Sequence, residues 1–393
     1  MFLKTIFLYL ASTACALNLN KDLFSNYSYQ QPPDDSFNVQ VGLALKSLNN
    51  VDHVDGTMET NVWLRHYWND PRLVWDNEKY NTSRTVISTN RDDEYKIWTP
   101  DIYIYNTAEL PLTQMKYSHA IIYNNGNIIW SRPGIIKSTC IFNLHRFPYD
   151  YQNCYLKFGS WVYPGNVLNL SIRGNIDLSN YKQGEEWEID STDEELEIKY
   201  YQCCPEPYYS AIFYINIKRM SKFYVANIII PIFATSSLLV VSMMIPWESG
   251  ERISFTTTIM LTIVVFLSIL SENLPKTNDV PMLTNLVTGL MFFSLSVVFI
   301  TVLVSSMRTM DKDESLFTKY MFKLFVKCGA ISCVKDNKNV QRRSISYDHA
   351  LNLAVDEELS KICKKYSVKL EHGATILFFL VFLCYCLAAI FYI

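Results

Sequence analysis

Residues 140–154 read Cys140-Ile-Phe-Asn-Leu-His-Arg-Phe-Pro-Tyr-Asp-Tyr-Gln-Asn-Cys154, so two cysteines enclose 13 residues. On both sides of this stretch, short segments rich in β-branched and aromatic residues alternate with turn signals such as Asn125-Gly126 and Pro133-Gly134. This pattern predicts an all-β domain at residues 17–222, built as a sandwich of two sheets.

The first 16 residues have the features of a secretory signal. Lys4 supplies a positive charge, residues 6–10 are apolar, and Ala14-Cys15-Ala16 fits a cleavage site. The alternative, a first membrane helix, would need an apolar run of about 20 residues. We therefore expect residues 1–16 to be removed and the β domain to reach an oxidising compartment where disulfides form.

The predicted β domain carries candidate disulfide and glycosylation sites. Three pairings are possible for its four cysteines, and their spacing alone does not choose among them. These cysteines are Cys140, Cys154, Cys203 and Cys204. Glycosylation is signalled by three Asn-X-Ser/Thr triplets, a pattern that is also common by chance. The triplets begin at Asn26, Asn81 and Asn169.

Four apolar segments follow the β domain, and each is long enough to cross a membrane as a helix. They are residues 223–245, 253–271, 282–307 and 374–393. Residues 308–373, between the third and fourth segments, carry 13 Lys and Arg against 9 Asp and Glu, which favours the cytoplasmic side. We therefore expect a four-helix transmembrane bundle with both termini outside the cell.

The predicted cytoplasmic segment contains a helical pattern of apolar residues. The pattern consists of Leu351, Val355, Leu359, Ile362 and Tyr366. It predicts an amphipathic helix that leads into the last span. A solvated helix without a specific partner explains the pattern equally well.

The second predicted span contains seven Ser and Thr side chains. Spacings of three and four place one set of side chains on a single stripe, with a carboxylate at each end and an apolar middle. The stripe consists of Glu251, Ser254, Thr258, Leu261, Val265, Ser268 and Glu272. Repeated around a symmetry axis, it would form two acidic rings on either side of a hydrophobic constriction, which suits a cation pore. In the alternative, the hydroxyls bond their own helix in a packed bundle; this explains the hydroxyls but not the two glutamates in phase.

The cysteine-flanked stretch, with Phe147-Pro148-Tyr149-Asp150 inside it, resembles the signature loop of the Cys-loop pentameric ligand-gated ion channels. Further segments that resemble this family are Trp98-Thr-Pro-Asp-Ile-Tyr-Ile-Tyr-Asn106, Pro231 in the first span and Gly250-Glu-Arg-Ile-Ser254. The resemblance covers residues 38–310 and the final helix. It implies an extracellular β-sandwich, a four-helix transmembrane bundle, pentameric assembly and a disulfide between Cys140 and Cys154.

The segment Tyr201-Gln-Cys203-Cys204-Pro-Glu-Pro-Tyr208 resembles the ligand-capping loop of nicotinic acetylcholine receptor alpha-type subunits. The resemblance implies that the two adjacent cysteines are bonded to each other. Such a bond closes a small, strained ring and is therefore rare.

The resemblance also implies a site where aromatic ring faces hold a cationic amine at a subunit interface. Its principal face would consist of Tyr105, Trp161, Tyr201 and Tyr208 with Cys203 and Cys204. The neighbouring subunit would supply Trp63, with Ile121, Ile129 and Ser131 as further contributors. Without the resemblance, any one of these aromatics would be assigned to the sandwich core, where we expect Trp68, Trp75 and Trp98.

The sequence departs from the family pattern beside this site. Val162 follows Trp161 where a small residue, often a hydroxyl residue, is usual, and Pro164 precedes Gly165. Ser210 replaces the acidic residue that usually lies near Lys157 and Tyr201. By contrast, Arg219 and Asp150 are both present and are expected to form a charged pair.

The resemblance implies a cation-selective channel subunit in the postsynaptic plasma membrane, surrounded by lipid and opened by acetylcholine or a related cationic amine. Because the chain carries both faces of the site, a homopentamer and a heteropentamer with related subunits are both possible. The alternative is a non-conducting receptor-like scaffold or an accessory subunit of a heteropentamer.

Other classes of protein fit poorly. A formal net charge of −3 without a basic block argues against nucleic acid as a partner. No motif pairs a nucleophile with a base, so we expect no enzyme activity, and we expect no cofactor or metal.

Overall fold

The computed structural model describes residues 19–90, 92–109, 118–246, 249–275, 280–308, 367–385 and 387. It divides into two compact units, with the main boundary between Ser221 and Lys222. The first unit is built mainly of strands and the second of helices. The predicted signal at 1–16 and the predicted amphipathic helix at 351–366 lie outside the described residues.

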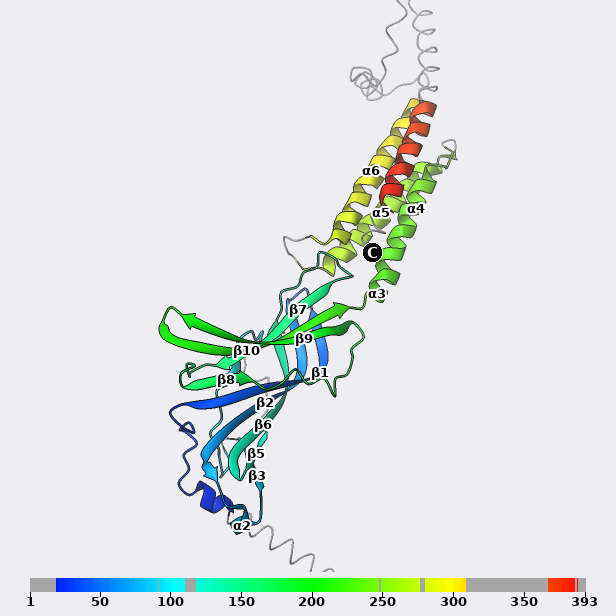
Figure 1. Ribbon diagram of the computed structural model, residues 1–393. Coiled ribbons are helices and arrows are strands. Elements are labelled where there is room, and N and C mark those ends of the chain that lie inside the picture. The colour runs from blue at the N-terminus through cyan, green and yellow to red at the C-terminus, as the bar shows by residue number, and fades with distance from the viewer. Residues whose placement is uncertain are drawn as a thin grey trace, which may run out of the picture. The chain divides into compact units, whose positions relative to one another are not determined.

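The first unit is a sandwich of two sheets, as predicted (Figure 1). The six-stranded sheet has the order β3-β5-β6-β2-β1-β8, and the four-stranded sheet has the order β4-β7-β10-β9. Neighbouring strands are antiparallel except for β1 and β8, which are parallel. The strands are β1 (Phe37–Asp52), β2 (Thr57–Val74), β3 (Arg84–Ser88), β4 (Ile102–Ile104), β5 (His119–Tyr123), β6 (Asn125–Thr139), β7 (Tyr151–Ser160), β8 (Leu168–Ile172), β9 (Trp187–Tyr201) and β10 (Cys204–Arg219).

The core lies between the two sheets because apolar residues alternate along the strands. On β2, every second residue from Met58 to Trp68 is buried, while Trp63 faces away from the core and remains exposed. Trp68, Trp75 and Trp98 are buried, as predicted. A short helix, α2 (Asn77–Tyr80), follows β2, and residues 19–24 form another helical turn ahead of the sandwich.

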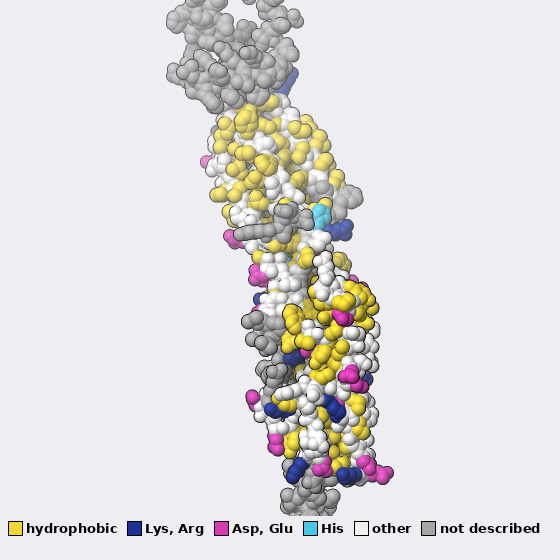
Figure 2. Space-filling view, turned by 90° about the vertical axis from the view of Figure 1, so that its left-hand side faces the viewer, with side chains coloured by type: hydrophobic (Ala, Val, Ile, Leu, Met, Phe, Trp, Pro, Cys, Tyr) yellow, Lys and Arg dark blue, Asp and Glu magenta, His cyan; other side chains and the backbone are white. Residues whose placement is uncertain are grey.

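The second unit contains four helices that are long and apolar enough to cross a membrane. They span Lys222–Ser242, Glu251–Glu272, Met282–Ser306 and Ser367–Tyr385. The first consists of α3 (Lys222–Tyr224), the π-helical turn η2 (Val225–Ile229) and α4 (Ile230–Ser242), whereas α5 (Glu251–Glu272) and α6 (Met282–Arg308) are continuous. Hydrophobic side chains cover much of this unit's surface in Figure 2, as a lipid-facing bundle requires.

Proline explains the irregular start of the first span. Pro231 has no backbone N–H and its ring disfavours a regular helical turn before it. The chain accommodates it with the π-helical turn, in which the Ile230 N–H donates to the Val225 carbonyl.

Candidate functional site

The four predicted principal-face aromatics all belong to the four-stranded sheet. Tyr105 follows β4, Trp161 follows β7, Tyr201 ends β9 and Tyr208 lies on β10. The rings of Tyr105 and Trp161 have centroids 6.4 Å apart and meet edge to face, and those of Tyr201 and Tyr208 do so at 5.5 Å. The structure therefore brings these side chains into two ring pairs.

Burial governs the ionisation of Tyr105. The pKa of Tyr105 is raised to about 12, first by burial and then by the proximity of Tyr201, Asp101 and Tyr208. Its hydroxyl donates to the Ser160 carbonyl, which fixes the ring at the edge of the site. Tyr105 therefore remains a neutral phenol at physiological pH, with its ring face available to a cation.

Trp161 is the most exposed of these rings, with 73% of its surface accessible. Its backbone is nevertheless held firmly, because the Asp101 carboxylate accepts hydrogen bonds from the Trp161 N–H at 3.1 Å and the Val162 N–H at 2.7 Å. The same carboxylate accepts from the Ser160 hydroxyl at 2.7 Å. Burial raises the pKa of Asp101, whereas these hydrogen bonds act in the opposite direction. A large apolar ring is thus presented to solvent on a rigid loop.

The substitutions beside Trp161 do not remove this support. Asp101 binds the backbone of Val162, which any residue other than proline provides. The carbonyl of Pro164 accepts hydrogen bonds from the backbone N–H groups of Val167 and Leu168. The loop is therefore closed through its backbone, although its side chains differ from the family pattern.

Two glycines allow the loops of the site to approach each other. A Cβ atom at Gly159 would lie 2.7 Å from the Tyr105 ring, so a side chain there would displace that ring. The Gly165 N–H donates to the Pro207 carbonyl at 2.6 Å, which ties the Trp161 loop to β10. The segments of the predicted principal face are thus connected to one another.

The hairpin of β9 and β10 carries the adjacent cysteines at its tip. Cys203 and Cys204 are joined by a disulfide, and Cys204 pairs with Tyr201 in the hairpin register. The register shifts between Cys204 and Pro207, which places Tyr208 opposite Lys199. The bonded cysteines therefore lie at the end of the hairpin that also carries Tyr201 and Tyr208.

The predicted complementary-face residues lie on the other sheet. Trp63 is on β2, Ile121 on β5, and Ile129 and Ser131 on β6. Ile121 pairs with Ile129, Ser131 pairs with Arg65, and Trp63 pairs with Pro133 farther along the same two strands. Trp63 is 39% exposed and the other three are half-buried. One chain thus carries the two predicted half-sites on separate sheets.

Lys157 has an acidic partner that the sequence did not reveal. Its ammonium forms an ion pair with Glu197 of β9, across the intervening strand β10. Ser210, which replaces the usual acidic residue, pairs with Glu197 in the register and leaves room for the contact because it is small. A carboxylate is therefore kept beside Lys157 but comes from the neighbouring strand.

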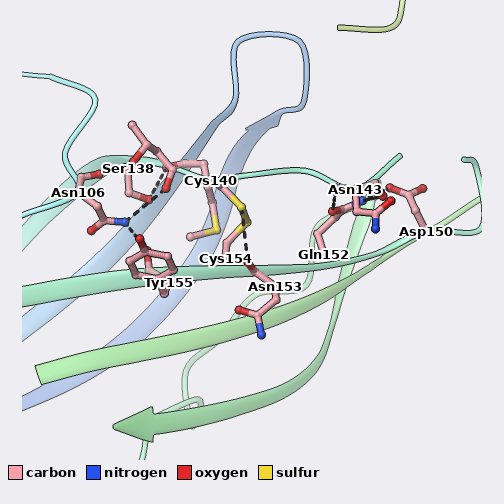
Figure 3. The surroundings of a disulfide bond; sticks show 11 residues. Asn106, Ser138, Cys140, Asn143, Asp150, Gln152, Asn153, Cys154 and Tyr155 are labelled. Carbon is pink, nitrogen blue, oxygen red and sulfur yellow. Dashed lines mark hydrogen bonds between the residues drawn. A yellow bond between two sulfur atoms is a disulfide. The ribbon is translucent and has the colours of Figure 1, made fainter. Parts of the chain in front are cut away.

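The signature loop is closed by the disulfide between Cys140 and Cys154 (Figure 3). Gln152 holds the loop from inside, accepting from the Asn143 N–H at 2.8 Å and donating to the Asn143 carbonyl at 2.9 Å. It also donates to Asp150, whose carboxylate receives Arg219 at 2.8 Å. The predicted pair of Arg219 and Asp150 is confirmed, and both side chains are fully buried.

The predicted stripe on α5 lies along one face of the helix. All seven of its side chains are exposed in the isolated chain, including Leu261 at 63% and Val265 at 50%. The buried residues of α5 lie on other faces; they are Arg252, Thr256, Ile259, Ile263 and Leu270. Thr258 and Ser268 donate to carbonyls one turn earlier in the helix, so their hydroxyls alone do not distinguish a pore from a packed bundle.

The three predicted glycosylation sites are all exposed: Asn26, Asn81 and Asn169. Asn81 has a left-handed backbone at the end of α2, and the Asn169 side chain donates to Asn38 at 2.8 Å. Their side chains are therefore accessible in the folded β unit.

A β-sandwich followed by four candidate membrane spans, with an aromatic cluster at its loops, defines a multi-pass membrane receptor. A family model described as the neurotransmitter-gated ion-channel ligand binding domain matches residues 16–221. A second, described as the neurotransmitter-gated ion-channel transmembrane region, matches residues 228–384. The chain belongs to the neurotransmitter-gated ion-channel family. Its members are ligand-gated ion channels rather than enzymes, and pentameric assembly is typical of them.

Curated relatives are acetylcholine receptor subunits. The chain is 35% identical over 271 residues to acetylcholine receptor subunit alpha-type acr-16 of Caenorhabditis elegans, which covers 67% of this chain and 54% of the relative. It is 36% identical over 313 residues to the human neuronal acetylcholine receptor subunit alpha-6, which covers 78% of this chain and 62% of that relative. It is 32% identical over 329 residues to the acetylcholine receptor subunit alpha-like 2 of Drosophila melanogaster, which covers 79% of this chain and 56% of that relative. The chain thus spans little more than half the length of these relatives.

Proposed function

We propose that the chain is a subunit of a cation-selective channel opened by acetylcholine or a related cationic amine. The observation that carries this proposal is that Trp161 exposes 73% of its surface while its ring meets Tyr105 edge to face, with Tyr201 and Tyr208 as a second ring pair. A large ring held rigidly in solvent is expected to be covered by a ligand or a partner. Exposed aromatic ring faces of this kind suit a quaternary or protonated amine.

The two predicted half-sites lie on different sheets of one chain, and a complete site would form where two chains lie side by side. Each interface of a pentamer would then join the principal face of one subunit to the complementary face of the next. Acetylcholine receptor subunits among the relatives support this arrangement. The exposed stripe of α5 would line the pore, with Glu251 and Glu272 at its ends.

This proposal also gives the topology and location. Residues 17–222 lie outside the cell with disulfides Cys140–Cys154 and Cys203–Cys204, residues 308–373 lie in the cytoplasm, and both termini are outside. The receptor would act in the postsynaptic plasma membrane. A non-conducting scaffold or an accessory subunit of a heteropentamer is the second candidate. A receptor domain can bind a ligand even when the assembled subunits do not conduct ions.

Voltage clamp of cells that express the chain alone tests the proposal with acetylcholine and choline as agonists. Replacing Trp161 with Ala should raise the half-maximal agonist concentration about thirtyfold, equivalent to about 2 kcal/mol of lost cation–π energy. Trp161→Phe should cost less because it retains a weaker ring face. Tyr200→Ala is the control, since Tyr200 is an exposed neighbour whose strand partner is Pro207 rather than a ring of the cluster.

The outcomes separate the two candidates. A response that is sensitive to Trp161 but not to Tyr200 supports the amine-gated channel. Trp161 variants that respond like the parent would show that the site is elsewhere. A protein that reaches the surface as a pentamer and never conducts would favour the scaffold.

A further inference from the structure

A lysine of the same chain lies over the ring of Trp63. The Lys46 ammonium is 3.6 Å from the ring centroid, well inside the range of about 6 Å for a cation–π contact. Trp63 is the aromatic residue of the proposed complementary face. The ring face that would attract a ligand cation therefore already has a cation over it.

The position of Lys46 follows from a bulge in β1. Leu45 pairs with Val62 and Ser47 pairs with Asn61, so Lys46 is the extra residue between two consecutive pairs. A bulge of this kind redirects the side chain of the inserted residue. The Lys46 carbonyl accepts from the Lys182 N–H at 2.8 Å, which anchors the bulge. The contact with Trp63 is therefore built into the strand pairing.

The charge on Lys46 is not neutralised by an ion pair in the described parts of the chain. The neighbouring cation on β2 behaves differently, since Arg65 pairs with Asp177 at 2.8 Å. Lys46 thus brings an uncompensated positive charge to the ring of Trp63, with which it forms a cation–π contact.

We propose that Lys46 is a tethered competitor that determines how strongly the complementary face of this chain binds a cationic amine. This inference rests on the proposed function. To use the ring face, an incoming ammonium must displace Lys46 or bind beside it against like-charge repulsion. Either route weakens binding, so the chain's complementary face is the weaker half of the site. A related subunit with a neutral residue at this position would form the stronger interface with this chain's principal face.

The test uses the full chain under voltage clamp with tetramethylammonium, a cation that has no hydrogen-bond donor or acceptor. Lys46→Met keeps the apolar stem and removes the charge, so it should lower the half-maximal concentration about two- to fivefold. Lys46→Arg should stay near the parent because it keeps the charge and also stacks on rings. Lys79→Met is the matched control, since Lys79 lies 4.7 Å from the Tyr80 ring at α2, outside both faces.

Charge is then restored chemically in a Lys46→Cys variant. Modification with a positively charged aminoethyl methanethiosulfonate should return the half-maximal concentration toward the parent value. A negatively charged sulfonatoethyl reagent should lower it further, because it would attract the ligand. The parent channel treated with the same reagents is the control, because Cys384 is an exposed free thiol.

Failure of this inference differs from failure of the proposed function. A channel that depends on Trp161 but is unaffected by Lys46→Met and by the charge of the cysteine adduct overturns the role of Lys46 alone. A half-maximal concentration that rises in Lys46→Met also overturns it, since Lys46 would then support the ring. Receptors that reach the surface and respond to no amine in any variant refute the proposed function, and this inference with it.

Discussion

Lys157 and Glu197 lie diagonally across β10, because Lys157 pairs with Ile212 and Glu197 pairs with Ser210 of that strand. The lysine side chain is 16% exposed and that of the glutamate 35%, so water only partly screens the pair. Glu197 belongs to the hairpin that carries the bonded cysteines, whereas Lys157 belongs to the strand that leads into Trp161. The ion pair therefore connects the two segments that form the proposed principal face.

Breaking this ion pair should weaken agonist action. Glu197→Gln removes the charge at constant size and should raise the half-maximal agonist concentration about two- to fivefold, the effect of a partly exposed pair. Adding Ser210→Asp to Glu197→Gln should restore much of the loss, because residue 210 lies opposite residue 197 and beside Lys157. Glu195→Gln is the control, since that carboxylate accepts from the Tyr214 hydroxyl instead. Equal responses of Glu197→Gln and Glu195→Gln would contradict this role.

His66 is a buried titratable residue in the core side of β2, stacked against Trp130 with ring centroids 5.1 Å apart. Burial, and secondly the charge of Arg132, lowers the pKa of His66 to about 3. In the unfolded chain the imidazole takes up a proton near its ordinary pKa of about 6.5. Between these values the unfolded state binds more protons, so stability falls as the pH decreases from 6.5 toward 3.

This linkage predicts a pH dependence that one substitution removes. His66 should cost about 2 kcal/mol of folding stability between pH 6.5 and pH 5. His66→Gln should flatten that part of the profile even where it lowers stability at pH 7. Thermal unfolding midpoints at pH 7 and pH 5 measure the slope, with the exposed His119→Gln as control. An unchanged slope in His66→Gln would contradict the assignment.

At the scale of elements, the two-sheet domain and the four spans were predictable, because β-branched and aromatic segments and long apolar runs mark them in the sequence. The spacing along α5 predicts a stripe whose residues are all exposed, whereas a surface role for Trp63 was expected only from the resemblance to the family. Contacts across strands were not predictable. Glu197 reaches Lys157 only through the register of three strands, and Lys46 reaches Trp63 only through a bulge.

The last span shows a second limit of sequence reasoning. The described helix begins at Ser367, ahead of the predicted start at 374, and so includes the charged residues Lys369 and Glu371. Hydropathy excludes such residues from a span. In the structure Glu371 forms an ion pair with the buried Arg252 of α5. The partner that makes the charge tolerable lies more than a hundred residues away in the sequence.

Leu261 is the element-scale test of the proposed pore, because it is the central apolar residue of the α5 stripe and is 63% exposed. In a pentamer it would form an apolar girdle that closes by excluding water. Leu261→Ser should make the girdle easier to wet, so that half-maximal activation occurs at an agonist concentration about tenfold lower. Ile263→Ser, on the buried face, is the comparison and should instead reduce surface expression. A Leu261→Ser channel with unchanged sensitivity would place the girdle elsewhere.

At the scale of the whole molecule, the proposed pentamer contains five copies of each residue of the stripe. Glu251 begins α5 and Glu272 ends it, and both are exposed. Five copies of each would form two rings of negative charge at opposite ends of one helix. Such rings concentrate cations and repel anions, as a cation channel requires and a non-conducting scaffold does not.

Ion selectivity tests whether these two rings line the pore. In sodium gradients the parent current should reverse near the cation equilibrium potential. Glu251→Gln removes the charge of one ring at constant size and should shift the reversal potential toward that of chloride or lower the conductance, because the attraction for cations at that end of the pore is lost. Glu251→Asp should behave like the parent, and Glu78→Gln on α2 is the control for a charge outside the stripe.

Glu272→Gln should act in the same direction as Glu251→Gln, and the double variant more strongly than either. A parent current that reverses at the chloride potential would refute cation selection, and selectivity unchanged in the double variant would remove both rings from the pore.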